Sequence, residues 1–217
     1  MRDSGEIYSQ HTSNKFNEEL EKLRTDFLEM GRTVKQQVTD SLQALLNQDI
    51  SLAESTRELD RETNRFENQI DKDCEQIIAL RQPAAVDLRL VLSINRAIVD
   101  LERIGDEASR VAKQAIDLSN SESSNKSLHE VSHIGELVTE MLSSVLIAFE
   151  NRDIEMAYKV VKSDKNVDRE YQSTMRALIT FMMEDSRSIS SVLNIIWILR
   201  ALERIGDHAC NLAEQVI

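Results

Sequence analysis

The sequence predicts an all-α protein, built as a tandem repeat of two three-helix bundles with six long antiparallel helices. The 217 residues include only five Gly and one Pro. Because turns and strand ends draw heavily on those two types, the depletion argues against a β or α/β protein. Apolar residues recur three or four positions apart over long stretches, which is typical of helices with one buried face. A six-residue block is also repeated, first as Leu101-Glu102-Arg103-Ile104-Gly105-Asp106 and again as Leu202-Glu203-Arg204-Ile205-Gly206-Asp207, which indicates a duplicated unit.

Three helices are predicted in the first half. The elements are a flexible N-terminal arm (1–12) and helices over about 13–47, 49–81 and 84–118, and the three helices form the first bundle (13–118). Asp49 follows a short polar turn and is the expected N-cap of the second helix, because a carboxylate there accepts hydrogen bonds from first-turn N–H groups. Pro83, the single proline, is expected to end that helix, since it lacks an N–H and disfavours helical geometry in the preceding residue.

The second half repeats this plan after a polar, Ser-rich linker (119–125). Helices are predicted over about 127–151, 154–183 and 188–217, and they form the second bundle (126–217). Upstream of the doubled block, the halves align at an offset three residues larger than within the block, and we expect a loop to absorb this difference. The helical pattern still runs at Ile217 without a C-cap, so we expect the natural chain to continue.

The charge balance excludes several classes of protein. Lys and Arg number 26 and Asp and Glu number 38, for a net charge of −12. Such a chain repels nucleic acid phosphates and anionic lipid, so we expect no nucleic-acid partner. No stretch approaches the roughly 18 apolar residues of a membrane span, and the polar N-terminus lacks a signal peptide's apolar segment. Cys74 and Cys210 lack CxxC spacing, and a reducing cytoplasm fits them best.

The doubled block places two carboxylates four residues apart in each half. Glu102 pairs in this way with Asp106, and Glu203 with Asp207. On a helix such pairs project from one side, where they repel each other by roughly 0.2–0.5 kcal/mol unless a positive group offsets them. Oxygen ligands of this kind suit hard or borderline ions such as Mg²⁺, Ca²⁺, Mn²⁺ or Fe. One such pair is expected by chance on a charged helix face, but its return within an identical block favours metal binding.

The second helix of each half offers further oxygen ligands. Asp60 and Asn64 match Asp164 and Asp168 of the second half, again four residues apart. If the helices are antiparallel neighbours, these side chains lie opposite the carboxylates of the doubled block and give each site four oxygen-bearing side chains. The same residues could instead be surface groups near a turn, and the sequence leaves both interpretations open. Glu67 is a weaker candidate.

Glycine and arginine residues also recur at matched positions. The glycines form two pairs, Gly31 with Gly135 and Gly105 with Gly206. Gly in mid-helix costs roughly 0.5–1 kcal/mol relative to Ala, so we expect these positions to permit a close approach by a neighbouring helix rather than contact with a ligand. Arg103 and Arg204 lie away from the apolar stripe and are expected to form ion pairs or partner contacts.

Three segments carry a resemblance to a known family. They are the doubled block, the run Leu80-Arg81-Gln82-Pro83-Ala84-Ala85-Val86-Asp87-Leu88-Arg89, and Met182-Met183-Glu184-Asp185. With them the sequence resembles the PhoU family of bacterial phosphate-uptake regulators, over nearly the whole chain from about residue 12. The resemblance implies a fold of two similar three-helix bundles. It also implies metal ligands, which are Glu102, Asp106, Glu203 and Asp207 in the family motif, supported by Asp60, Asp164 and Asp168. Asn64 departs from a carboxylate at its place, so the first site would carry one fewer negative charge.

The resemblance implies a regulator rather than an enzyme. Its expected role is a metal-binding helical adaptor that negatively regulates phosphate uptake and the phosphate-starvation response. The expected partners are the ATP-binding subunit of the phosphate ABC transporter and a phosphate-sensing histidine kinase. The expected location is cytoplasmic, peripheral to the inner membrane through those partners, and we expect a homodimer. The expected ions are Fe, Zn, Mg, Mn or Ca.

A carboxylate-bridged metal enzyme or a metal-storage bundle is the alternative. Di-iron bundles of that class carry a Glu-x-x-His motif on two helices. This chain has the motif once, at Glu130 and His133, so the spacing is read as coincidence.

Overall fold

The computed structural model describes residues 4–119 and 128–217, with side chains described from Asn14 to Ser119 and from Val131 onward. The described residues form six α-helices, one short 3-10 helix and no strand. They are α1 (Ser4–Asn47), α2 (Ile50–Arg81), α3 (Ala85–Ser119), α4 (Leu128–Asn151), α5 (Ile154–Glu184), η2 (Ser186–Ser188) and α6 (Ile189–Glu214). The all-α prediction is confirmed. The predicted linker (119–125) lies outside the described residues apart from Ser119, which ends α3.

Local sequence signals set the ends of α2 and α5. Asp49 accepts a hydrogen bond from the N–H three residues along, at 3.0 Å, which confirms the predicted N-cap. Asp153 caps α5 in the same way, also at 3.0 Å. At the far end of α2, Gln82 adopts left-handed geometry with φ of 48° directly before Pro83. The helix therefore ends where the proline predicts.

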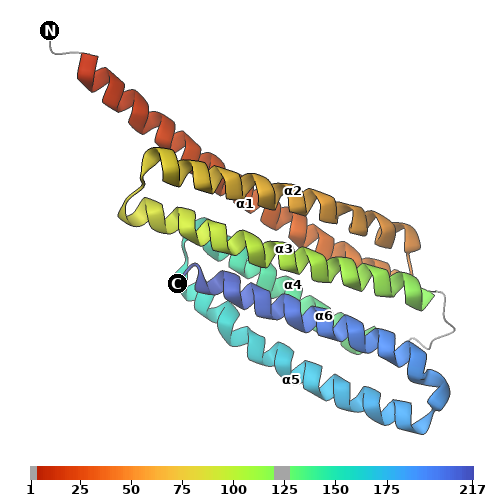
Figure 1. Ribbon diagram of the computed structural model, residues 1–217. Helices are drawn as coiled ribbons and strands as arrows, with labels where there is room; N and C mark the ends of the chain where they lie inside the picture. The colour runs from red at the N-terminus through yellow and green to blue at the C-terminus, as the bar shows by residue number, and fades with distance from the viewer. Residues whose placement is uncertain (1–3, 120–127) are drawn as a thin grey trace.

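Both termini differ from the predicted bounds. α1 starts at Ser4 rather than at 13, because neither Gly nor Pro interrupts residues 6–30. Most of the segment expected as an arm is therefore helical, and Figure 1 shows these first turns projecting beyond the other helices. At the other terminus α6 ends at Glu214 and residues 215–216 form a turn, so the helix does not run to the last residue.

The helices pack as two three-helix bundles joined along two seams. α1, α2 and α3 contact one another, as do α4, α5 and α6, and the bundles meet through α3 against α6 and α1 against α4. Figure 1 shows consecutive helices running antiparallel, with α3 and α6 side by side, α1 and α4 behind them, and α2 and α5 on the outer flanks. The predicted tandem of bundles is confirmed. The two helices that carry the doubled block therefore lie together at the centre of the molecule.

Glycines of α1 and α4 let these two helices approach closely. A Cβ on Gly135 would lie 2.6 Å from Leu42 Cδ2, and a Cβ on Gly31 would overlap Leu146 Cδ2 in the same way. The two contacts are reciprocal, because each leucine follows the glycine of its own helix by the same interval. The predicted role of these glycines in helix packing is confirmed.

The three-residue difference between the halves lies within a helix. The α2–α3 connection spans residues 82–84 and the α5–α6 connection spans residues 185–188, so the second connection is the longer one. α3 begins 16 residues before Leu101, whereas α6 begins only 13 residues before Leu202. The expectation that a loop absorbs the difference is therefore wrong. α3 has no buried residue before Val91, so a helix can be shortened at this end with little loss of packing.

α4 is the most apolar helix of the bundle pair. Contrary to the expectation that no stretch resembles a membrane span, Val131–Asn151 could span a membrane by length and composition alone, with a mean hydropathy of 1.3. Half of this segment is buried inside the protein, where α4 packs against α1, α5 and α6. Its hydropathy therefore matches that of a core helix between two bundles.

Candidate metal-binding sites

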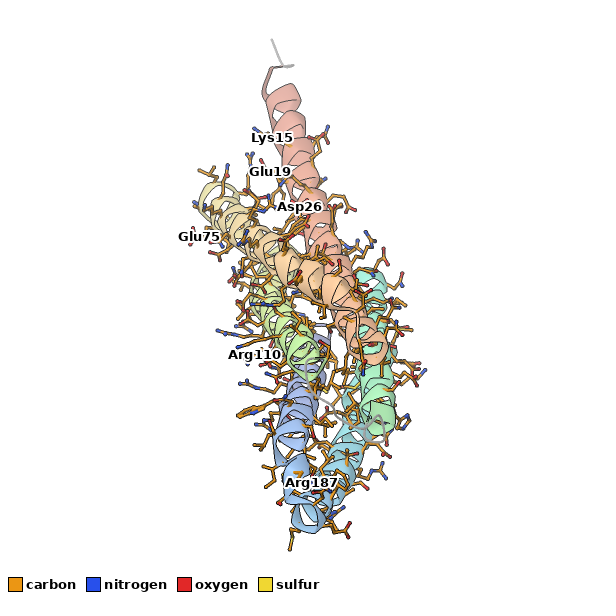
Figure 2. All side chains as sticks on the ribbon, turned by 90° about the vertical axis from the view of Figure 1, so that its right-hand side faces the viewer. Lys15, Glu19, Asp26, Glu75, Arg110 and Arg187 are labelled. Atoms are coloured by element: carbon orange, nitrogen blue, oxygen red, sulfur yellow. The ribbon has the colours of Figure 1, made fainter. Side chains whose placement is uncertain are left out.

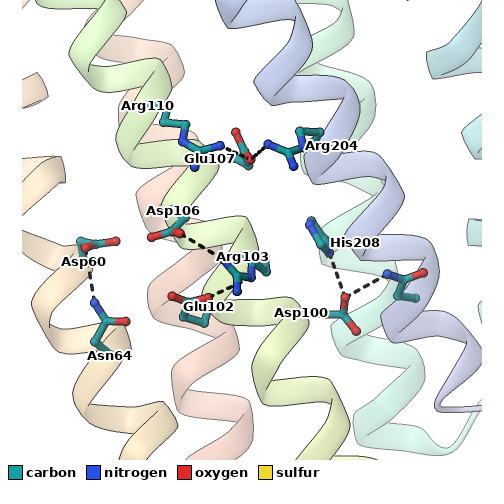
Figure 3. Close-up of polar contacts among 11 residues, drawn as sticks. Asp60, Asn64, Asp100, Glu102, Arg103, Asp106, Glu107, Arg110, Arg204 and His208 are labelled. Carbon is teal, nitrogen blue, oxygen red and sulfur yellow. Dashed lines mark hydrogen bonds and ion pairs between the residues drawn. The ribbon is translucent and has the colours of Figure 1, made fainter.

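The first candidate site lies between α2 and α3, where the predicted residues of the first half come together. α2 contributes Asp60 and Asn64, and α3 contributes Glu102 and Asp106 (Figure 3). Asn64 Nδ2 donates to Asp60 Oδ2 at 3.4 Å. Antiparallel packing of α2 on α3 therefore brings the two pairs opposite each other, which is one of the two arrangements that the sequence leaves open.

Burial and like charges dominate the electrostatics of this first site. Burial, followed by the charge of Asp106, raises the pKa of Asp60, while a hydrogen bond with Gln37 lowers it. Burial and Asp106 also raise the pKa of Glu102. Burial, then Asp71 and more weakly Asp106, raises the pKa of Glu67, while Arg103 lowers it, so this weaker candidate lies at the edge of the same field. A cation placed among these carboxylates would favour their charged forms.

Arg103 forms only long, solvent-exposed ion pairs with the carboxylates of the first site. Its Nε lies 3.5 Å from Glu102 Oε2 and its Nη1 lies 3.8 Å from Asp106 Oδ2. The arginine side chain is 57% exposed, so solvent screens both pairs. The predicted ion pairs of Arg103 are therefore present, yet the pKa of Glu102 stays raised.

The second candidate site, between α5 and α6, repeats the arrangement. α5 contributes Asp164 and Asp168, and α6 contributes Glu203 and Asp207. Burial, then Asp168 and Asp207, raises the pKa of Asp164. Burial, then Asp207, raises the pKa of Glu203 even though Arg200 Nη1 lies 2.9 Å from its Oε1. Equivalent positions in the two halves therefore gather carboxylates in equivalent ways.

The two glycines of the doubled block differ in how closely neighbouring side chains approach them. A Cβ on Gly105 would lie 3.1 Å from Gln37 Oε1, and a Cβ on Gly206 would lie 3.4 Å from Asp164 Oδ1. Gly105 therefore permits close packing, as predicted, whereas the contact at Gly206 is one that an ordinary Cβ would also make. Cys210 borders the second site, and burial raises the pKa of its thiol to about 12, so it is a neutral neighbour of Asp164.

The oxygen-bearing side chains of the two sites are chemically suited to bind a cation, but they do not converge on one point. Among the side chains that the structure describes, no group of three or more His, Cys, Asp or Glu converges closely enough to hold a metal ion. Carboxylate oxygens suit hard or borderline cations, and to coordinate one the side chains would have to rotate toward a common point. Metal binding by Asp60, Asn64, Glu102, Asp106, Asp164, Asp168, Glu203 and Asp207 stays a prediction.

A buried carboxylate that the sequence reasoning missed lies between the two bundles. Glu107 of α3 is only 5% exposed. Its Oε1 accepts hydrogen bonds from Arg110 Nη1 at 2.6 Å and from Arg204 Nη1 at 2.7 Å (Figure 3). Arg204 therefore forms an ion pair within the chain, which is one of the two roles predicted for it. The signal in the sequence is the spacing of Glu107 and Arg110, three residues apart beside the apolar stripe.

A second polar contact ties the same seam. His208 Nδ1 of α6 lies 2.8 Å from Asp100 Oδ1 of α3, and Asn211 Nδ2 donates to the same oxygen at 3.0 Å. The position that matches His208 in the first half holds Glu107. The two halves therefore use matched positions of α3 and α6 to join the bundles.

Comparison with known proteins agrees with this architecture. The PhoU domain family matches residues 27–115 and 131–216. A phosphate-specific transport system accessory protein PhoU homolog of Pseudomonas aeruginosa is 52% identical over 207 residues, which cover 95% of this chain and 86% of that protein. The phosphate-specific transport system accessory protein PhoU of Escherichia coli K12 is 43% identical over 206 residues, covering 95% and 85% of the two chains.

A solved structure shares the fold. The crystal structure of PhoU from Pseudomonas aeruginosa superimposes with a TM-score of 0.91 at 52% identity, covering 93% of this chain and 97% of that one. Sequence and fold therefore agree over both bundles, and the chain belongs to the PhoU family.

Proposed function

We propose that this chain is an accessory protein of a phosphate-specific transport system, as the names of its relatives describe theirs. It acts by binding other proteins rather than by catalysis. As a helical adaptor it links the ATP-binding subunit of the phosphate ABC transporter to a phosphate-sensing histidine kinase, and it represses the phosphate-starvation response when phosphate is plentiful. It works in the cytoplasm at the inner membrane, as a homodimer.

We further propose that each bundle binds a metal ion between its second and third helices. The observation that carries this proposal is the gathering of carboxylates at matched positions in both halves, with raised pKa values at Asp60, Glu102, Asp164 and Glu203. Like charges kept together in two places call for an offsetting cation. When bound, the metal would neutralise the site; the carboxylates of this chain would hold and orient it.

Gene deletion tests the regulatory role. Deleting the gene is expected to derepress phosphate-starvation genes in phosphate-rich medium, and the wild-type gene is expected to restore repression. Unaltered repression in the deletion strain would contradict the proposal.

Elemental analysis tests the metal sites. Wild-type protein is expected to retain metal after desalting, and the Glu102→Ala, Glu203→Ala double variant is expected to lose most of it. Glu29→Ala with Glu170→Ala is the matched control, because both glutamates are exposed and lie outside the two sites. Equal metal content in all three proteins would show that the carboxylate pairs serve only as a charged surface.

A metal enzyme or storage bundle makes a different prediction. It would consume oxygen when Fe²⁺ is added, whereas the adaptor would not. Sustained oxygen consumption that the double variant abolishes would favour this alternative.

A further inference from the structure

Charge is unevenly distributed over a chain whose net charge is −12. The exposed residues of α3 carry five basic side chains and only one acidic side chain, Asp117. The basic ones are Arg89, Arg96, Arg103, Arg110 and Lys113. The remaining acidic residues of α3 are partly or fully buried. α3 therefore presents a positive face to solvent in an otherwise acidic protein.

The four arginines of this face are spaced seven residues apart, and two apolar residues repeat at the same interval. Leu92 is 40% exposed and Val99 is 47% exposed. Seven residues are close to two helical turns, so each series drifts by only about 20° per step and stays on one side of the helix. That side lies opposite the buried residues Ile94 and Leu101. We call Arg89, Leu92, Arg96, Val99, Arg103 and Arg110 the arginine stripe.

The arginines of the stripe have N–H donors that form no hydrogen bond within the part of the protein that the structure describes. Within the described ranges, the side chains of Arg89 and Arg96 have no hydrogen bond and no ion pair. Arg103 and Arg110 are paired, but their side chains are 57% and 55% exposed, and each guanidinium carries five N–H donors. Figure 2 shows Arg110 on the outer side of α3, away from α1. The stripe is therefore open to a partner.

The adjoining helix α6 extends this surface. Arg204 reaches Glu107 at the seam and is still 46% exposed, and Arg200, four residues earlier, is 52% exposed. Trp197, seven residues before Arg204, is 62% exposed. Arg and Trp dominate the residues that contribute most to protein–protein binding.

We propose that the arginine stripe docks an acidic, amphipathic helix of a partner protein. A seven-residue repeat of apolar residues flanked by charges is the pattern by which one helix packs along another at a small crossing angle. The partner helix presents an apolar seam to Leu92 and Val99, flanked by Asp or Glu residues spaced to meet the arginines. Arg89 to Arg110 spans about 30 Å at 1.5 Å per residue, which matches a helix of about 20 residues.

Charge on both sides of the stripe favours a narrow protein element over an extended polyanion. The carboxylates of the first site border the stripe on the side of α2, and those of the second site lie beyond α6. A flat anionic membrane or a nucleic acid duplex would meet these carboxylates as well as the arginines. A single helix lies along the arginines alone, and guanidinium groups bind its carboxylates in a bidentate fashion.

A designed peptide provides a direct test. The probe is a synthetic helix of about 21 residues with Leu at the seam positions and Glu at the flanking positions, and its matched control carries Lys in place of every Glu. We expect the full chain to bind the Glu peptide but not the Lys peptide. In the Arg89→Glu, Arg96→Glu variant the Glu peptide should bind at least about tenfold more weakly. The control variant Arg57→Glu, Arg65→Glu, with two exposed arginines of α2, should bind it like wild type.

The outcomes separate the alternatives. Failure to bind the Glu peptide, or equal binding by the two variants, would overturn the inference. Tighter binding to phosphatidylglycerol vesicles or duplex DNA than to the peptide would indicate an anionic surface as the partner. That result would also overturn the inference. Circular dichroism of each variant confirms that it is folded. The inference rests on the proposed function only in that the chain binds other proteins. The peptide assay does not depend on any phosphate phenotype, so the docking surface and the proposed regulatory role can each fail without the other.

Discussion

Asp164→Asn is expected to stabilise the metal-free protein at pH 7. Asp164 lies on α5, four residues before Asp168, and faces Asp207 of α6. Burial is the largest cause of its raised pKa, and the two acidic neighbours raise the pKa further. Asn keeps the size of the side chain and can still accept a hydrogen bond from Cys210, but it removes the charge. The substitution therefore removes repulsion from a site that has no cation in it.

The size of the repulsion that Asn removes can be worked out from the two acidic neighbours, Asp168 and Asp207. A like-charge pair four residues apart on a helix costs roughly 0.2–0.5 kcal/mol, and Asp207 adds a second repulsion of similar size across the helix contact. The free energy of unfolding should therefore rise by roughly 0.4–1 kcal/mol. A protein of this length shifts its Tm by about 2–4 °C per kcal/mol. We expect the Tm to rise by about 1–4 °C.

The sign of the stability change depends on how the charge of Asp164 varies with pH. The pKa of Asp164 is raised in the folded state above its ordinary value of 3.8. The folded state therefore binds the proton more tightly than the unfolded state, so the destabilisation begins as the pH rises past the ordinary value and is complete above the folded pKa. The advantage of Asn should be full at pH 7 and should vanish below about pH 4, where the carboxyl is protonated in both states.

Differential scanning calorimetry in the presence of a chelator measures this effect across the pH range. Glu170→Gln is the control, because Glu170 lies on the same helix, is exposed and lies outside the site. Its Tm should match that of wild type at each pH. A wild-type or lower Tm for Asp164→Asn at pH 7, with the control unchanged, would refute the argument from like charges.

Three further predictions concern the seams and the thiols. Glu107→Ala leaves two arginines without their buried partner, so urea denaturation should show a loss of about 1–3 kcal/mol; no loss would mean that the buried carboxylate is not stabilising. Gly31→Ala should destabilise the wild-type protein, because the added Cβ overlaps Leu146. The same substitution should be tolerated in the Leu146→Ala variant, where the shorter side chain leaves space. Equal destabilisation in the wild-type and Leu146→Ala backgrounds would contradict the close approach of α1 to α4. Cys74 and Cys210 should resist iodoacetamide at pH 8 in the native state and react in urea, because burial raises the pKa of both thiols to about 12. Fast labelling of the native protein would contradict these raised pKa values.

Much of the candidate site could be predicted from local patterns. Residues four apart on a helix share one side whatever the rest of the chain does, so Glu102 and Asp106 follow from spacing alone. Their approach to Asp60 needed only the antiparallel packing that short connections favour. The spacing of Glu107 and Arg110 is also local, but it could not show that Glu107 is buried, because that burial depends on α6, which is about a hundred residues away in sequence. The arginine stripe likewise becomes a separate surface only once α2 and α6 cover the acidic residues on both sides of α3.

The sequence by itself determined the helices, their caps and the duplication. These depend on periodicity, on the conformational limits of Gly and Pro and on hydrogen bonds between near neighbours, which act over a few residues. Only the tertiary structure decided which helices meet between the bundles, that Gly31 and Gly135 face leucines across one seam, and that Arg204 reaches Glu107 across the other. Packing of one helix against another joins residues far apart in the chain, and shape and charge select that pairing from many that the same helical patterns allow.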